Sequence, residues 1–242
     1  MSYSVCPIAV CQGPRDGSHF TYRMNFGSIT NTACYAWYIM GSNPRILVDT
    51  GARAATFRAK GAPETDLISV EEGLARLGLT PADIDIVILT HLHCDHVELG
   101  CLFTKAQFIV QKRELEYAHK PHPIDTDLYD KRYFGSLNYK VIDGDTNISP
   151  GISILLTPGH TPGGQSVQIS TAAGKAIITG FCCTLNTFKQ TEEMKHRGWE
   201  VTTPLIHHDV RETYDSVLKV KRAADIILPL HAPEFIGKDL IP

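Results

Sequence analysis

The residues between Thr90 and His96 constrain this chain more than any other stretch, because four side chains of metal-binding type crowd into it. They are His91, His93, Asp95 and His96. The run before them, residues 84–89, is apolar and rich in β-branched residues, which predicts a buried strand. Loops at the carboxyl ends of buried strands often carry the chemistry of α/β proteins. Imidazole and carboxylate groups bind zinc, iron, manganese or nickel, so the stretch predicts a metal site.

The spacing of these residues suggests two neighbouring binding points. One residue separates His91 from His93, so both can face one point only from a bent or extended backbone. Asp95 and His96 follow at once and can serve a second point. The alternative is a polar loop that holds histidines by chance, since the chain has 11 of them. Four residues of ligand type directly after a strand favour the metal site.

The length and charge of the chain suit an ordinary α/β protein. Its 242 residues are enough for one α/β domain or two small ones, and 43% of them are apolar. The net charge is −3 with no long basic or acidic run, so we expect neither nucleic acid nor a membrane as a partner. No apolar run approaches the ~20 residues that span a bilayer, and residues 1–14 do not resemble a signal peptide.

The chain has seven cysteines, an odd number whose spacing indicates no disulfide framework. Free thiols are typical of a reducing compartment, so we expect a cytoplasmic protein. Cys94 lies inside the metal-binding stretch, where we interpret it as a packing residue.

Strands recur in two sets, and each set ends in a loop that carries histidine. The expected strands cover residues 5–11, 33–40, 45–48, 84–89, 107–110, 139–142, 152–156, 166–169, 176–179 and 226–228. Helices are expected after a capping box of Ser69 and Glu72, at residues 112–119 and at residues 209–223. Residues 13–17 are typical of a turn. Two such sets without a tandem repeat predict an α/β protein, one four-layer αβ/βα sandwich that forms a single domain over residues 1–242.

The motif His91-x-His93-x-Asp95-His96 resembles the signature of the metallo-β-lactamase fold. Three other landmarks agree with that family in their order along the chain: Leu47–Gly51, Thr157–Gly163 and Leu228–His231. Within the superfamily the chain is most similar to the N-acyl homoserine lactonases, because residues 138–145 and the Pro150-Gly151 pair resemble the corresponding sequence segments of that family. The resemblance covers about residues 30 to 235.

The resemblance implies a binuclear centre with two groups of metal ligands. His91, His93 and His160 surround one metal, and Asp95, His96 and His231 surround the second. Two zinc ions are implied, with iron or manganese as alternatives. Asp49 resembles a carboxylate that orients a metal-bound histidine. The alternative for Asp49 is a turn residue held by its own side chain.

Three places depart from the lactonase pattern, and one of them is residues 97–100, which replace the usual small Gly-containing turn. Phe181 stands where the family has an aspartate that bridges the two metals, and phenylalanine cannot bind a metal. Either Cys182 or Cys183 supplies a thiolate instead, with Cys182 as our candidate ligand, or the bridge is lost and one metal binds. Thr184 or Leu185 falls where lactonases keep a tyrosine that touches the substrate carbonyl, which leaves the lactone specificity open.

Three segments outside the ligands carry further expectations. In the resembling lactonases a loop like residues 20–26 borders the substrate pocket; the alternative is an ordinary surface loop. Residues 121–134 form a long connection with several aromatics, which is typical of an active-site lid. Glu98, just after the motif, is expected to point to solvent.

Together these features predict a metal-dependent hydrolase that opens a lactone or a related cyclic ester. A metal lowers the pKa of its water from 15.7 to about 7, so a metal-bound hydroxide attacks the carbonyl while Asp95 acts as general acid toward the leaving alkoxide. The alternatives are hydrolysis of a thioester, cyclic amide or phosphotriester, iron-dependent oxygen or sulfur chemistry, and a non-catalytic binding module. The partner is a small-molecule substrate, and the oligomeric state stays open, with a homodimer as one option.

Overall fold

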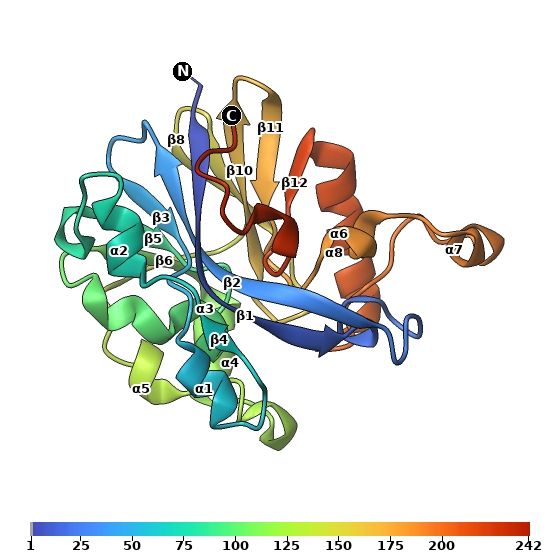
Figure 1. The fold of residues 1–242 in the computed structure, drawn as a ribbon. Coiled ribbons are helices and arrows are strands. Elements are labelled where there is room, and N and C mark those ends of the chain that lie inside the picture. The colour runs from blue at the N-terminus through green and yellow to red at the C-terminus, as the bar shows by residue number, and fades with distance from the viewer. Residues whose placement is uncertain (1) are drawn as a thin grey trace.

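Two β-sheets face each other across an apolar core, and helices cover their outer faces (Figure 1). The fold is seen in a computed structural model that describes residues 2–242. The two ends of the chain lie close together, because Val5 near the start exchanges backbone hydrogen bonds of 2.8 Å with Ile241 near the end. The two facing sheets with helices on their outer faces confirm the predicted αβ/βα sandwich.

The first sheet has seven strands in the order β4-β1-β2-β3-β5-β6-β7. They are β1 (Ser4–Asp16), β2 (Ile29–Met40), β3 (Ile46–Val48), β4 (Thr65–Asp66), β5 (Ile86–Ile88), β6 (Gln107–Gln111) and β7 (Tyr139–Ile142). β1, β2 and β3 pair antiparallel, whereas β3, β5, β6 and β7 pair parallel. The central strands β3 and β5 are buried by helices on one face and by the second sheet on the other, which explains their continuous apolar sequences. The edge strand β7 differs, because Lys140 and Val141 are exposed.

The first strand is longer than its apolar sequence suggested. β1 continues through Gly13 and Pro14 to Asp16, so the turn predicted at residues 13–17 is wrong. β4 pairs only with Cys11 and Gln12. Beyond these residues β1 is therefore an edge strand, where the missing N–H of a proline is tolerated.

The second sheet has five strands in the order β12-β11-β10-β9-β8. They are β8 (Thr146–Ser149), β9 (Ile152–Leu156), β10 (Gln165–Thr171), β11 (Gly174–Ile178) and β12 (Ile226–Leu228). The polar strand β8 was not expected, because its residues show no apolar alternation. The inner faces of both sheets contribute to one continuous core, which includes Trp37, Ile88, Ile154 and Ile178.

Eight α-helices and five short 3-10 helices are found among residues 2–242. The helices are α1 (Ala54–Arg58), α2 (Val70–Ala75), α3 (Cys94–Val97), α4 (Lys112–His119), α5 (Lys131–Phe134), α6 (Leu185–Phe188), α7 (Glu192–His196) and α8 (Val210–Ala223). Apolar residues of α2 to α5 pack on the outer face of the first sheet, and those of α8 pack on the second. The predicted Ser69–Glu72 capping box is present at α2.

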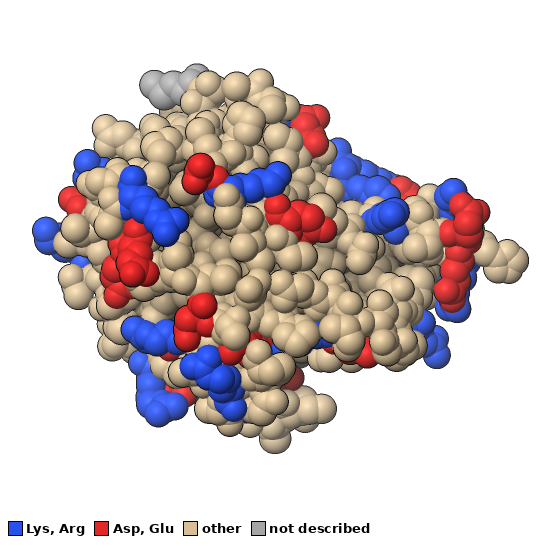
Figure 2. All heavy atoms as spheres, viewed as in Figure 1, with Lys and Arg blue, Asp and Glu red and all other residues tan. Residues whose placement is uncertain are grey.

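The strand ends that carry the predicted ligands meet at one edge of the sandwich (Figure 1). Asp49 follows β3, the stretch from His91 to His96 follows β5, and His160 and His231 follow β9 and β12. On the face in Figure 2, positive and negative side chains are interspersed. No helix among the described residues is long and apolar enough to cross a membrane.

Candidate metal centre

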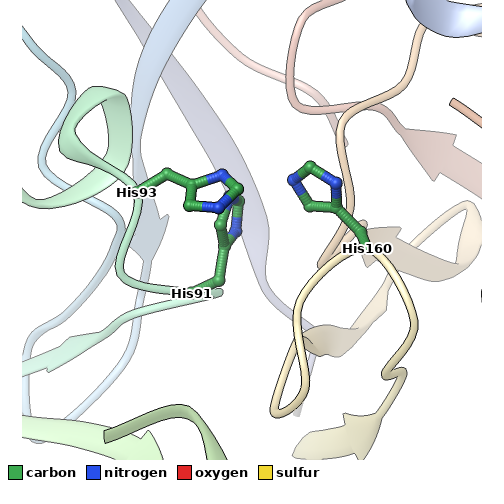
Figure 3. A group of neighbouring side chains, drawn as sticks. All are labelled: His91, His93 and His160. Atoms are coloured by element: carbon green, nitrogen blue, oxygen red, sulfur yellow. The ribbon is translucent and has the colours of Figure 1, made fainter. Parts of the chain in front are cut away.

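Three imidazole rings from two loops point at one another across the edge of the sandwich (Figure 3). His91 and His93 come from the loop after β5, and His160 comes from the loop after β9. Each ring offers a nitrogen, and these nitrogens lie within 4.8 Å of one another. The ring centroids are 4.6 to 4.9 Å apart and the planes are close to perpendicular. Rings arranged in this way present lone pairs to a common point.

Hydrogen bonds on the opposite side of two of these rings fix their orientation. The Nδ1 atom of His160 lies 2.7 Å from the carbonyl oxygen of Ile206, and Nδ1 of His91 lies 3.0 Å from the hydroxyl of Thr90. Among the described residues, the buried Nε2 atoms of His91 and His160 have no hydrogen-bond partner. A buried polar atom without a partner is costly. A cation bound to both nitrogens would remove that cost, so these residues fit a metal ion.

A second group of donors lies beside the first. The sulfur of Cys34, a carboxylate oxygen of Asp95 and a ring nitrogen of His231 lie within 4.8 Å of one another. His96 lies next to this group, with its Nε2 atom 3.3 Å from Oδ2 of Asp95. His231 is oriented by β2, because its Nδ1 atom lies 3.1 Å from the carbonyl oxygen of Ala33.

Asp49 holds the loop that carries the motif. Its carboxylate accepts hydrogen bonds of 2.7 Å from both the backbone N–H and the hydroxyl of Thr90, and it lies 2.8 Å from Nδ1 of His96. Asp49 itself has a φ of 54°, a left-handed conformation that aspartate and asparagine tolerate better than most residues. The geometry agrees with the expected orienting contact to a histidine of the motif.

Burial keeps four of the five histidines neutral at neutral pH. It lowers the pKa of His160 and His231 to about 4, and it lowers the pKa of His91 and His93 well below the usual value. Neighbouring imidazoles add to the effect on His91. Because a metal binds the neutral imidazole, these rings are already in the form that ligation requires.

Opposite charges dominate at the remaining pair, Asp95 and His96. Burial lowers the pKa of His96, but the carboxylates of Asp95 and Asp49 outweigh it and raise that pKa to about 10. Burial raises the pKa of Asp95, but His96 and His231 outweigh it and hold that pKa well below its usual range. Asp95 is therefore an ionised carboxylate, the form that binds a metal or accepts a proton.

Glu114 ties the two histidine loops together, and no pattern in the sequence singles it out. Its buried carboxylate accepts from the backbone N–H of Leu92 at 2.9 Å and from that of Gly163 at 3.1 Å. The hydroxyl of Tyr129 lies 3.3 Å from the same carboxylate. Burial raises the pKa of Glu114, although these hydrogen bonds act in the opposite direction. An acidic residue in the first turn of an amphipathic helix ordinarily faces solvent, so its burial was not foreseeable.

The two donor groups form the floor of a cavity of about 340 Å³. Its walls include Arg15, Phe20, Phe57, Lys60, Leu128 and Ile206. Phe20 belongs to the loop at residues 20–26 and Leu128 to the connection at residues 121–134, so both predicted segments reach the cavity. Cys94 also lines it, with its sulfur 3.3 Å from the ammonium of Lys60.

The cysteines after β11 lie differently from one another. Phe181 is fully buried among apolar residues beneath α8, with its ring 6.2 Å from that of Phe188. Cys183 packs in the same cluster, and its sulfur lies 3.1 Å from the hydroxyl of Thr179. Cys182 lines the cavity, so its side chain faces the donors. However, the thiol that lies within 4.8 Å of Asp95 and His231 belongs to Cys34, which sequence reasoning had missed.

The expectation that Glu98 points to solvent is wrong. Glu98 is buried, and its carboxylate accepts hydrogen bonds from the hydroxyl of Thr56 at 2.6 Å and from the backbone N–H of Arg53 at 3.1 Å. The Arg53 guanidinium lies 3.2 Å away. Glu98 therefore satisfies donors at the start of α1, which forms a wall of the cavity through Thr56 and Phe57.

The facing sheets and the grouped donors at their edge are those of a metal-dependent hydrolase of the two-sheet sandwich class. The chain belongs to the metallo-beta-lactamase superfamily, whose family model matches residues 29–231.

Individual relatives narrow the likeness to one group of hydrolases. An N-acyl homoserine lactonase of Bacillus thuringiensis is 30% identical over 181 residues, which cover 68% of this chain and 69% of the relative. One from Bacillus cereus is 24% identical over 93% of this chain and 88% of the relative. A solved quorum-quenching N-acyl homoserine lactone lactonase has a TM-score of 0.76 at 28% identity and covers 97% of this chain and 94% of its own.

Proposed function

We propose that this metal-dependent hydrolase opens the ring of a lactone, of which an N-acyl homoserine lactone is the first candidate. The observation that carries the proposal is the convergence of two donor groups on the floor of a cavity of about 340 Å³. A solved N-acyl homoserine lactone hydrolase that is 27% identical, with a TM-score of 0.75, holds its product at the catalytic metal centre. A cavity of this volume is within the range that binds small molecules.

Zinc is the metal that the donors favour, and two ions are proposed. His91, His93 and His160 would hold the first, and Asp95, His231 and, after loss of its proton, His96 would contribute to the second. Nitrogen, oxygen and sulfur donors together suit zinc or iron better than manganese. Bound metal would supply an activated water at neutral pH and polarise the substrate carbonyl.

The residues around the donors would then manage the proton. Asp95 is ionised, so it can accept a proton from the attacking water. It would pass that proton to the ring oxygen of the lactone as the bond to the carbonyl carbon breaks. His96 and His231 flank the Asp95 carboxylate at 3.3 and 3.7 Å and hold it in place. The leaving oxygen stays tethered to the product, which keeps it within reach of Asp95.

The walls of the cavity bear on which lactone is opened. Thr184 or Leu185 falls where the resembling lactonases keep a tyrosine, and neither residue lines this cavity. Phe20 and Phe57 offer apolar surface for an acyl chain, while Arg15 is paired with the buried Glu64. These two rings thus provide an apolar surface inside the cavity against which an acyl substituent on the ring can pack.

All seven cysteines are unpaired in the part of the chain that the structure describes. We infer from this that the enzyme works in a reducing compartment, the cytoplasm. We also propose that the chain forms one domain and that its substrate is a small molecule.

Elemental analysis and a substrate panel test the proposal. The purified protein should carry transition metal, and it should hydrolyse N-acyl homoserine lactones of several chain lengths faster than a thioester, a cyclic amide or a phosphotriester. Removal of the metal by a chelator should abolish turnover, and zinc should restore it. Full activity after chelation, or turnover of the other esters and amides without turnover of lactones, would contradict it.

A further inference from the structure

The residue Cys34 lies in the middle of β2, outside every motif that marks the metal centre. Its side chain is 6% exposed and lines the cavity. We propose that Cys34 is a thiolate ligand of the second metal position, together with Asp95 and His231, and that it takes over the ligand position vacated by the phenylalanine at 181. The inference rests on the proposed metal centre and deepens it.

The distances support direct ligation. Single donor atoms of Cys34, Asp95 and His231 lie within 4.8 Å of one another. Zinc–sulfur bonds are about 2.3 Å and zinc–nitrogen or zinc–oxygen bonds about 2.0 to 2.2 Å, so an ion placed among the three atoms needs only small side-chain shifts. No other cysteine among the described residues belongs to a group of this kind.

The strand β2 builds two parts of this position from adjacent residues. The carbonyl oxygen of Ala33 lies 3.1 Å from Nδ1 of His231, which leaves Nε2 facing Oδ2 of Asp95 at 3.7 Å. The next residue is Cys34, on the same strand. The strand that fixes the tautomer of His231 therefore also places the sulfur beside it, as a hydrogen bond to the remote nitrogen does for many metal-bound histidines.

The segment after β11 cannot supply the missing ligand at the position where the family has it. Phe181 is buried with Phe188 in the apolar cluster beneath α8. Cys183 is held there too, against the hydroxyl of Thr179. Cys182 faces the cavity but lies outside the group of converging donors. A second position with only Asp95 and the neighbouring imidazoles would have one anionic ligand, and a thiolate at Cys34 provides a second.

A thiolate changes which metal the second position prefers. Sulfur is a soft donor, and it selects zinc or iron over manganese and magnesium. The first position, with three imidazoles, has no such preference for a thiophilic ion. The two positions should therefore differ in metal affinity and in spectroscopic signature, which makes the sulfur directly observable.

Cobalt substitution of the full-length protein tests the assignment without using activity. A Co²⁺–thiolate bond gives an intense sulfur-to-metal charge-transfer band that imidazole and carboxylate ligands do not give. We expect this band in the wild-type protein when the second equivalent of Co²⁺ binds. The Cys34→Ser variant should lose the band and bind its second equivalent at least about 10-fold more weakly, a loss that even the partner of a ligand can cause.

Three variants serve as controls. Cys182→Ser and Cys11→Ser should keep the band, although Cys11 pairs with Cys34 across β1 and β2. Cys34→Asp should regain tight binding of the second equivalent without the band, because it restores a carboxylate. The first equivalent should bind every variant normally, which shows that the variants are folded.

The outcomes separate this inference from the proposed function. Persistence of the band in Cys34→Ser, its loss in Cys182→Ser, or its absence from a wild-type protein that binds two equivalents and opens lactones would overturn the inference alone. A wild-type protein with the band at Cys34 that opens no lactone would instead overturn the proposed substrate and leave the thiolate ligand standing.

Discussion

The two donor groups on the floor of the cavity are built in different ways. The first consists of three imidazoles from two short loop motifs, and each loop is held by Glu114. The second mixes sulfur, oxygen and nitrogen from the middle of β2, the start of α3 and the loop after β12. One group is therefore local in sequence, and the other depends on strands that meet only in the folded sandwich.

The chain departs from the lactonases it resembles in the second donor group. The triple-imidazole group agrees with the family pattern at every position. The second group lacks the expected carboxylate at Phe181 and has the thiol of Cys34 nearby. Metal choice is therefore a property that we attribute to the second group, while the first provides the common hydrolytic chemistry.

The largest effect we expect comes from the first group. His91→Ala removes one of three converging nitrogens and should lower lactone hydrolysis by about 10³-fold, the upper end of what the loss of one charge-stabilising group costs. Metal content should fall from two ions toward one or none. The matched control is His196→Ala, because His196 is exposed on α7, away from the cavity. Wild-type kinetics for His91→Ala would show that the first donor group does not provide the hydrolytic chemistry.

A smaller loss should follow from Asp49→Asn, which acts on the second group through His96. Asparagine tolerates the φ of 54° and keeps the shape of the side chain, but it removes the charge that faces Nδ1 of His96. The loss of such a partner typically costs about 10- to 100-fold in metal affinity. Titration with zinc should show this loss for one of two equivalents. Equal weakening of both would mean that the two groups are not independent.

Much of this architecture was predictable because its signals are local. The strand before His91 and the helix at residues 112–119 follow from periodicity over a few residues. The motif itself fixes most of the ligand types, since nothing else explains so many imidazoles and a carboxylate after a buried strand. The positions of His160 and His231 were implied only by the family resemblance, and the structure brings both to the motif.

The residues that were missed depend on contacts across the fold. Cys34 was an ordinary strand residue until β2 packed beside the loop after β12. Glu114 and Glu98 are acidic residues in the first turns of short helices, where a solvent-facing side chain is the usual outcome, yet both are buried and accept from backbone N–H groups of other loops. No periodicity reveals which backbone N–H groups a distant loop will leave unpaired.

A more modest change should follow from Glu114→Gln, which tests the support of the first group. The carboxylate accepts from Leu92, Gly163 and Tyr129, so an amide would turn an N–H donor toward groups that are themselves donors. One unpaired buried donor costs about 1 to 3 kcal/mol of folding stability. Thermal unfolding should therefore occur about 2–4 °C lower per kcal/mol lost. We also expect weaker binding of the first metal equivalent. An unchanged melting temperature would show that Glu114 does not support the loops.

The smallest effect that we expect is on the pH dependence of folding stability, and one histidine of each donor group contributes to it in the same direction. In chelated protein, His160 of the first group and His231 of the second each have a pKa of about 4, below the ordinary 6.5. The unfolded chain therefore binds protons that the folded chain does not, and stability should fall as the pH drops from 6.5 to 4.

His96 acts in the opposite direction and sets the other limit. Its pKa is about 10, so the stability it contributes is complete below pH 6.5 and is lost as the pH rises toward 10. The histidine contribution to the stability of the chelated protein should thus be largest near pH 6.5. Urea unfolding at a series of pH values measures it, and His160→Gln should make the acid side shallower by about one proton. A slope that His160→Gln leaves unchanged would show that His160 is already protonated in the chelated fold, and that the first group does not hold its rings neutral without metal.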